Sequence, residues 1–179
     1  MRRSLWMLLA LVPAPAVAHP VDEIVQGAYL TLAPGEVRLE LDLTPGSEVA
    51  GALLRELDAN SDARISRAEM LAYGWRVLRQ STLTLDGAVV PWRLQQIRAP
   101  SYQNIRTAAA TLKIFAVAVR PERAAPHTLV YLNRYRPAKS QCIANVFLLP
   151  GAGWQYRVLD QKHDKEGRQL SVAYLAATG

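Results

Sequence analysis

A strict alternation of apolar and polar residues is the feature that most constrains the fold of this chain. In VRLELDL, residues 37–43, every second side chain is apolar and those between them are charged. Because side chains point alternately to the two faces of a β-strand, this pattern predicts an antiparallel strand with one buried face. The apolar run IVQGAYLTL (24–32) and the turn sequence APGE precede it. Together the three segments predict a β-hairpin.

Similar runs recur from residue 81 almost to the C-terminus, and Pro and Gly residues separate most of them. Many short strands at near-regular spacing favour a β-sandwich, and a length of 179 residues favours one domain. We expect that domain to comprise residues 19–179. The further predicted strands are STLTLDG and AVVPWRLQQI around an Asp-Gly turn, TAAATLKIFAVAV (107–119), HTLVYLNRY, CIANVFLL, WQYRVLD and LSVAYLA.

Between these strand regions, the apolar residues take the spacing of a helix. In residues 44–57 they follow Ser47, which we expect to cap the first helix. Residues 67–80 carry two apolar stripes, one containing Tyr73 and the other Trp75. A helix with two apolar faces is expected to pack between two neighbours. The sequence therefore predicts a helix-loop-helix at about residues 46–80.

The loop between the two predicted helices has oxygen-bearing side chains at the spacing that calcium requires. Ca²⁺ takes about six to eight oxygen ligands, and a short loop supplies them when they recur at alternate positions. The pattern D-x-[DN]-x-[DN]-x6-E over residues 58–69 closely resembles an EF-hand loop. The predicted metal ligands are Asp58, Asn60, Asp62, Arg64 through its backbone carbonyl, Ser66 through a water, and Glu69. The expected fold is mainly β: an antiparallel β-sandwich with an inserted EF-hand-like helix-loop-helix.

One residue of the loop departs from the usual pattern. Ala63 occupies the position normally taken by Gly, where the chain turns with a positive φ, and this costs roughly 1 kcal/mol. A metal-free alternative also exists, because Ser66 and Glu69 match a helix capping box. A capping role does not explain why Asp58, Asn60 and Asp62 occur at alternate positions of the loop. The sequence shows no second loop, so we expect a weak, structural calcium site of roughly 10⁻⁴ to 10⁻³ M.

The first eighteen residues are organised as a secretory signal peptide. Arg2 and Arg3 precede the apolar run SLWMLLALV, and Ala16-Val17-Ala18 is a small-x-small cleavage site. We predict cleavage between Ala18 and His19 and a periplasmic or secreted protein, with an uncleaved anchor as the alternative. No later segment has eighteen consecutive apolar residues, so no transmembrane segment is expected in the mature chain.

Charge and cysteine content exclude some classes of function. The mature chain has 19 basic and 15 acidic residues, and a net charge of +4 does not indicate nucleic-acid binding. Basic residues gather at 134–139 and 162–168, either as a solvated face or as a site for an anionic partner. Cys142 is the only cysteine, which excludes an internal disulfide, and we expect it in the core.

No hydrolase or phosphate-binding motif is present, so we do not expect an enzyme. One alternative depends on the predicted cleavage, which would make His19 the N-terminal residue. An α-amine with its own imidazole can chelate copper, and a copper-dependent oxidative enzyme would need a second histidine. His127 and His163 are the only other histidines.

The segment HPVDEIVQGAYLTLAPGEVRLELDLTPGSEVA, followed by LDANSDARISRAE, resembles the extracytoplasmic N-terminal module of bacterial hydrogenase/urease accessory-type permeases for nickel or cobalt. The resemblance covers about residues 19–90. It implies an exported calcium-binding module that uses the six ligand positions given above. Those permeases continue into transmembrane helices, whereas this sequence ends at Gly179, so transport is not implied. The resulting prediction is a calcium-binding interaction protein, with an accessory role beside an inner-membrane permease as an alternative.

Overall fold

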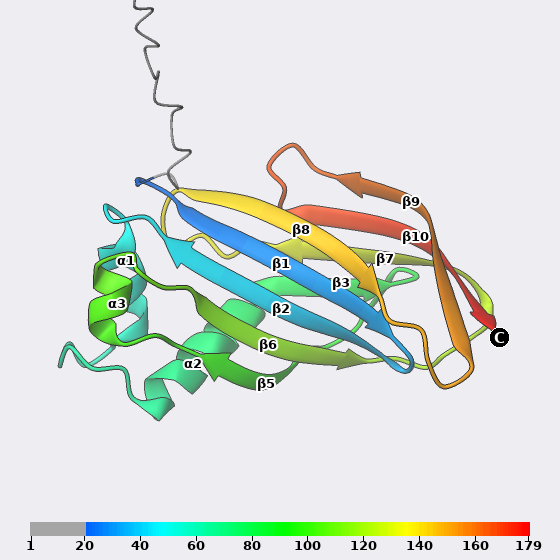
Figure 1. Cartoon of the computed structure of the whole chain (residues 1–179), viewed down its shortest axis with the longest axis horizontal. Coiled ribbons are helices and arrows are strands. Elements are labelled where there is room, and N and C mark those ends of the chain that lie inside the picture. The colour runs from blue at the N-terminus through cyan, green and yellow to red at the C-terminus, as the bar shows by residue number, and fades with distance from the viewer. Residues whose placement is uncertain (1–20) are drawn as a thin grey trace, which may run out of the picture.

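The computed structural model describes residues 21–179, which form ten strands and three short helices (Figure 1). The predicted signal peptide, its cleavage site and His19 lie outside the described residues. The strands form two five-stranded sheets. The prediction of a mainly β, largely antiparallel fold is confirmed.

The first sheet has the strand order β5-β6-β2-β1-β8. β1 and β2 form the predicted hairpin, in which Ile24 lies opposite Pro45 and Ala33 lies opposite Glu36. β8 runs parallel to β1, although every other neighbouring pair in this sheet is antiparallel. The strands are β1 (Ile24–Ala33), β2 (Glu36–Pro45), β5 (Arg93–Arg98), β6 (Leu112–Val119) and β8 (Ser140–Leu148).

The second sheet has the order β4-β3-β7-β10-β9 and is antiparallel throughout. The Asp-Gly turn between β3 and β4 has a positive φ at both residues, 50° at Asp86 and 82° at Gly87, as a tight two-residue hairpin requires. The strands are β3 (Ser81–Leu85), β4 (Ala88–Val89), β7 (Ala125–Asn133), β9 (Trp154–His163) and β10 (Gln169–Thr178).

The inner faces of the two sheets share one apolar core. Leu30 and Leu39 of the first sheet belong to the same buried cluster as Leu129 and Val172 of the second. Alternate residues of β2 are buried, as the period-two pattern of residues 37–43 predicted. This shared core agrees with a sandwich of two layers.

Three helices lie between the strands: α1 (Ala50–Leu57), α2 (Arg67–Leu78) and α3 (Tyr102–Arg106). α1 and α2 connect β2 to β3, and Figure 1 shows α1 beside α3 at one end of the molecule. The prediction that Ser47 caps α1 is wrong, because the helix begins after Val49, which provides no side-chain cap. β2 extends to Pro45, so Ser47 lies in the turn that joins the strand to the helix.

The predicted burial of α2 on two faces holds only in part, because Leu78 of the second stripe is buried but its other two residues are not. Tyr73 and Val77 are fully buried, but Leu71 and Trp75 of the second stripe are 42% and 43% exposed. The buried side faces β5, where Gly74 has no side chain and the Ile97 side chain fills the space that a Cβ would occupy. The helix contacts α1 as well as β5 and β3, and Trp75 is left at the surface.

The segment 88–97 was predicted as a single strand, but it divides between the two sheets. Its first two residues form β4 in the second sheet, and β5 begins at Arg93 in the first. Pro91 lies at the crossing, where its lack of an N–H prevents continuous strand pairing. Similarly, the predicted strand 107–119 begins at Leu112, and α3 before it was not predicted.

Candidate metal centre

The acidic loop, residues 58–69, joins the end of α1 to the first turn of α2. Asp58 ends α1, and its backbone N–H donates to the carbonyl of Leu54 at 2.8 Å. Ser66 is the N-cap residue of α2. The apolar residues Leu53, Leu57 and Tyr73 of these helices are completely buried. The loop is therefore held at both ends by helices that are anchored in the core.

The side chains at the first three alternate positions all turn inward. The two carboxylate oxygens of Asp58, a residue only 6% exposed, accept from the backbone N–H groups of Asp62 at 3.2 Å and Ala63 at 3.0 Å. The Asn60 amide oxygen also accepts from the N–H of Asp62, at 3.1 Å. Asp62 accepts from the N–H of Arg64 at 2.8 Å and from the Asn60 side chain at 3.1 Å. These oxygens thus face the same turn of backbone.

Glu69 closes the loop from the opposite side. One of its carboxylate oxygens accepts from the N–H groups of Ala59 at 3.0 Å and Asn60 at 3.4 Å. The other accepts from the backbone N–H and the hydroxyl of Ser66, at 2.9 and 2.7 Å. The predicted capping box is confirmed, because the Ser66 hydroxyl also accepts from the N–H of Glu69. These hydrogen bonds, led by those from Ser66, hold the pKa of Glu69 below its usual value.

The backbone of the loop contains two residues in the left-handed region. Ala63 has φ = 60°, as expected for the position at which EF-hand loops carry Gly. Ser61 has the same φ and was not singled out from the sequence. The loop therefore adopts a tight bend without glycine, and the side chains of Asp58, Asn60, Asp62 and Glu69 turn toward its backbone N–H groups.

The other predicted ligand positions lie on the outer part of the loop. Arg64 is exposed, and its backbone N–H is bound to Asp62. Ile65 is half-buried and packs against the core. Tyr102 of α3 lines a cavity on each side of the loop, one with Ile65 and the other with Asp58. α3 is therefore the nearest support of the loop, and nothing in the EF-hand pattern predicted it.

The carboxylates of the loop are not arranged as a preformed metal cage. Within residues 21–179 no three His, Cys, Asp or Glu side chains come close enough together to hold a metal ion. Asp58, Asp62 and Glu69 instead accept hydrogen bonds from backbone N–H groups of the loop itself. All three side chains would bind a metal through oxygen, which is the ligand atom that Ca²⁺ prefers. Coordination would require some of these oxygens to exchange N–H donors for the ion.

The described histidines are engaged elsewhere. His127 is buried, and its two ring nitrogens lie 2.7 Å from a carboxylate oxygen of Asp86 and 2.9 Å from the carbonyl of Arg123. His163 is bonded through Nε2 to the carbonyl of Ala144 at 2.7 Å. Since His19 lies outside the described residues, the copper hypothesis stays a prediction.

Cys142 is half-buried on β8, not fully buried in the core. Burial raises the pKa of its thiol, which lowers the fraction of reactive thiolate. This environment gives no support to a nucleophilic role.

Comparisons with known proteins do not assign a family. No protein-family model matches the chain, and no curated protein has a significantly similar sequence. Among the helices of residues 21–179, none has the length and apolar character needed to cross a membrane. The function is therefore inferred from the chain's own residues.

Proposed function

We propose that this protein is an exported calcium-binding module in which an EF-hand-like loop, inserted into a β-sandwich, holds a structural Ca²⁺. The observation that carries the proposal is the inward orientation of four oxygen-bearing side chains at loop positions one, three, five and twelve. Asp58, Asn60, Asp62 and Glu69 would supply side-chain oxygens. Arg64 would supply its carbonyl, and Ser66 would act through a water.

A capped helix terminus remains the competing explanation for part of the loop. The capping box accounts for Ser66 and Glu69, and neither residue needs a metal for that role. It does not account for three further inward-facing residues on a bend that forces Ala63 to a positive φ. Strain of this kind costs roughly 1 kcal/mol. A cation bound by the loop would offset that cost.

Calorimetric titration with CaCl₂ tests the site. The most informative variant is Asp62→Asn, because its amide oxygen can still accept from the N–H of Arg64 while the charge is lost. We expect the wild-type chain to bind with a Kd of roughly 10⁻⁴ to 10⁻³ M and the variant to bind at least about tenfold more weakly. Glu48→Gln is the matched control, because it removes an exposed carboxylate outside the loop. Equal heats for all three proteins would refute the proposal.

Export and a membrane partner are also proposals, supported by the signal-peptide pattern and by the resemblance of residues 19–90. Mass spectrometry of the protein recovered from the periplasm is expected to show an N-terminus at His19. Chemical cross-linking in the cell is expected to recover an inner-membrane permease. A full-length chain retained in the cytoplasm would contradict both.

A further inference from the structure

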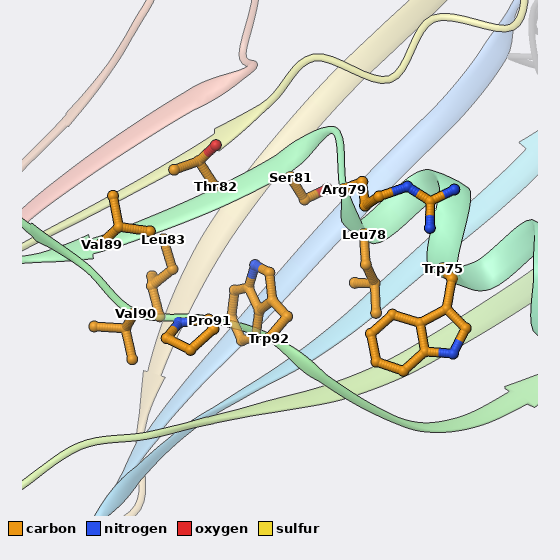
Figure 2. A pocket seen from close by; sticks show the side chains of 10 residues that line it. All are labelled: Trp75, Leu78, Arg79, Ser81, Thr82, Leu83, Val89, Val90, Pro91 and Trp92. Atoms are coloured by element: carbon orange, nitrogen blue, oxygen red, sulfur yellow. The ribbon is translucent and has the colours of Figure 1, made fainter.

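A small cavity of about 260 Å³ lies between the C-terminal end of α2 and the β3–β4 hairpin (Figure 2). Its walls are mainly apolar and include Leu83, Val90 and Pro91. Trp75 projects from α2 at one side, and Trp92, in the segment before β5, lies in the middle of the view. Trp75 is 43% exposed, although the second apolar stripe of α2 had been expected to pack against a neighbour. The cavity is therefore open beside an aromatic side chain that no described element covers.

The one charged residue that lines this cavity is a cation, and Ser81 and Thr82 contribute hydroxyls, which can donate or accept. Arg79 is an exposed lining residue, and none of the ten lining residues is acidic. At the same edge Arg134 donates to the hydroxyl of the lining residue Thr82, at 3.2 Å. The indole nitrogen of Trp92 is buried and finds no hydrogen-bond partner among the described residues. In Figure 2 this nitrogen points toward β3, the strand that forms the far wall.

An unpaired buried N–H is unusual, because losing its hydrogen bond to water costs free energy that a protein acceptor normally repays. Within residues 21–179 no group accepts from the Trp92 indole N–H, and Arg79 and Arg134 add positive charge near an apolar volume. A ligand with an apolar body and a negatively charged head group complements the apolar walls and the positive charge at their edge. A cationic ligand would find no carboxylate among the lining residues.

We propose that the cavity between α2 and the β3–β4 hairpin binds a small organic carboxylate, with its apolar part against Trp75 and Trp92 and its carboxylate near Arg79. The volume is slightly below that of typical drug-sized sites, so the ligand is expected to have a short chain or a single ring. The proposal is independent of the acidic loop, because no loop residue lines this cavity.

The test is an NMR titration of the full chain, observing the indole N–H resonances in the presence of a calcium chelator. The probes are octanoate, octanol and octylamine, which share an alkyl tail and differ in the charge of the head group. Octanoate is expected to shift the indole signals of Trp75 and Trp92 in a saturable manner below about 10 mM. Octanol is expected to bind about tenfold more weakly, and octylamine weaker still.

The variant Arg79→Gln is expected to weaken octanoate about tenfold and to leave octanol unchanged. Arg79 is exposed, so the substitution leaves the core intact. Arg157→Gln is the matched control, since it removes an exposed arginine of β9 outside the cavity, and it is expected to bind octanoate as the wild type does. The proposal is overturned if octanoate gives no saturable shift, if octylamine binds as well as octanoate, or if Arg79→Gln has no effect.

Discussion

Two carboxylates near opposite ends of the molecule are held in contrasting ways. Glu122 follows β6 and binds Gly35 in the β1–β2 turn, whereas Glu69 lies in the first turn of α2. Figure 1 shows the β1–β2 turn and the start of α2 at opposite ends of the molecule. One oxygen of Glu122 lies 2.7 Å from the Arg120 guanidinium, a side chain that is 1% exposed. The same oxygen accepts from the N–H of Gly35 at 2.8 Å and the hydroxyl of Tyr156 at 2.6 Å.

The contrast lies in where the partners come from. Besides Arg120, two positions away, Glu122 binds Tyr156 and Gly35, which lie 34 and 87 positions away in the sequence. Arg120 also lies near the rings of Tyr156 and Tyr174. Glu69 is bound only by groups at most ten positions away, and these groups are exposed to solvent. A carboxylate held by distant strands is part of the framework. A carboxylate held by its own loop can exchange its partners for an ion.

The largest expected effect follows from breaking the buried pair. Glu122→Ala leaves the Arg120 guanidinium buried without its counter-charge, and we expect a loss of about 3–5 kcal/mol in the free energy of unfolding. Urea denaturation measures this loss. The control is Glu166→Ala, which breaks exposed ion pairs to Arg136 and Arg168 and should cost at most about 1 kcal/mol. Similar losses in the two variants would remove the distinction between framework and surface carboxylates.

Calcium is expected to have the next largest effect on stability. At a free concentration ten times the Kd, binding to the folded state alone adds about 1.4 kcal/mol. Thermal unfolding of the wild type should shift upward by a few degrees, whereas Asp62→Asn should gain at most about 0.4 kcal/mol and shift correspondingly less. Glu122→Ala, if enough of it folds, should gain the same stability from calcium as the wild type does. An increment that disappears with Glu122 would show that the two ends are coupled.

Acid should weaken the buried pair. Burial raises the pKa of Glu122, but hydrogen bonds from Tyr156, the Gly35 N–H and Arg120 outweigh it and hold the pKa below the ordinary value of 4.5. A depressed folded-state pKa contributes stability that is complete above the unfolded value and is lost as pH falls through the folded value. The free energy of unfolding of the wild type should therefore decrease as the pH is lowered below about 4.5. That of Glu122→Gln should decrease less over the same range. Parallel pH profiles would contradict this assignment.

The smallest expected effect concerns the bend of the acidic loop. Ala63→Gly removes the steric cost of a positive φ and should stabilise the metal-free protein by up to about 1 kcal/mol. Ala59→Gly is the control, because Ala59 does not have a positive φ and gains nothing from the change. Equal effects of the two glycines on the urea midpoint would show that Ala63 is unstrained.

Local patterns predicted the parts of this structure that depend on nearby residues. The hairpin of residues 24–45, the Asp86-Gly87 turn, the capping box of Ser66 and the positive φ of Ala63 follow from periodicity and turn chemistry. The crossing at Pro91 and the exposure of Trp75 depend on which distant strands lie nearby, and periodicity carries no such information. The sequence likewise gave the candidate ligands of the loop, but not the hydrogen bonds that now occupy them.

The parallel pairing of β1 with β8 has a consequence for how the chain must fold. Ile24 lies opposite Ser140, a partner 116 positions later in the sequence. Contacts this distant are slow to form, because a long segment must be ordered before they yield any stabilisation. During synthesis the β1–β2 hairpin can assemble early, yet one edge of β1 has no partner until most of the chain has left the ribosome. Because β8 is synthesised late, this edge strand of the first sheet is among the last to be added.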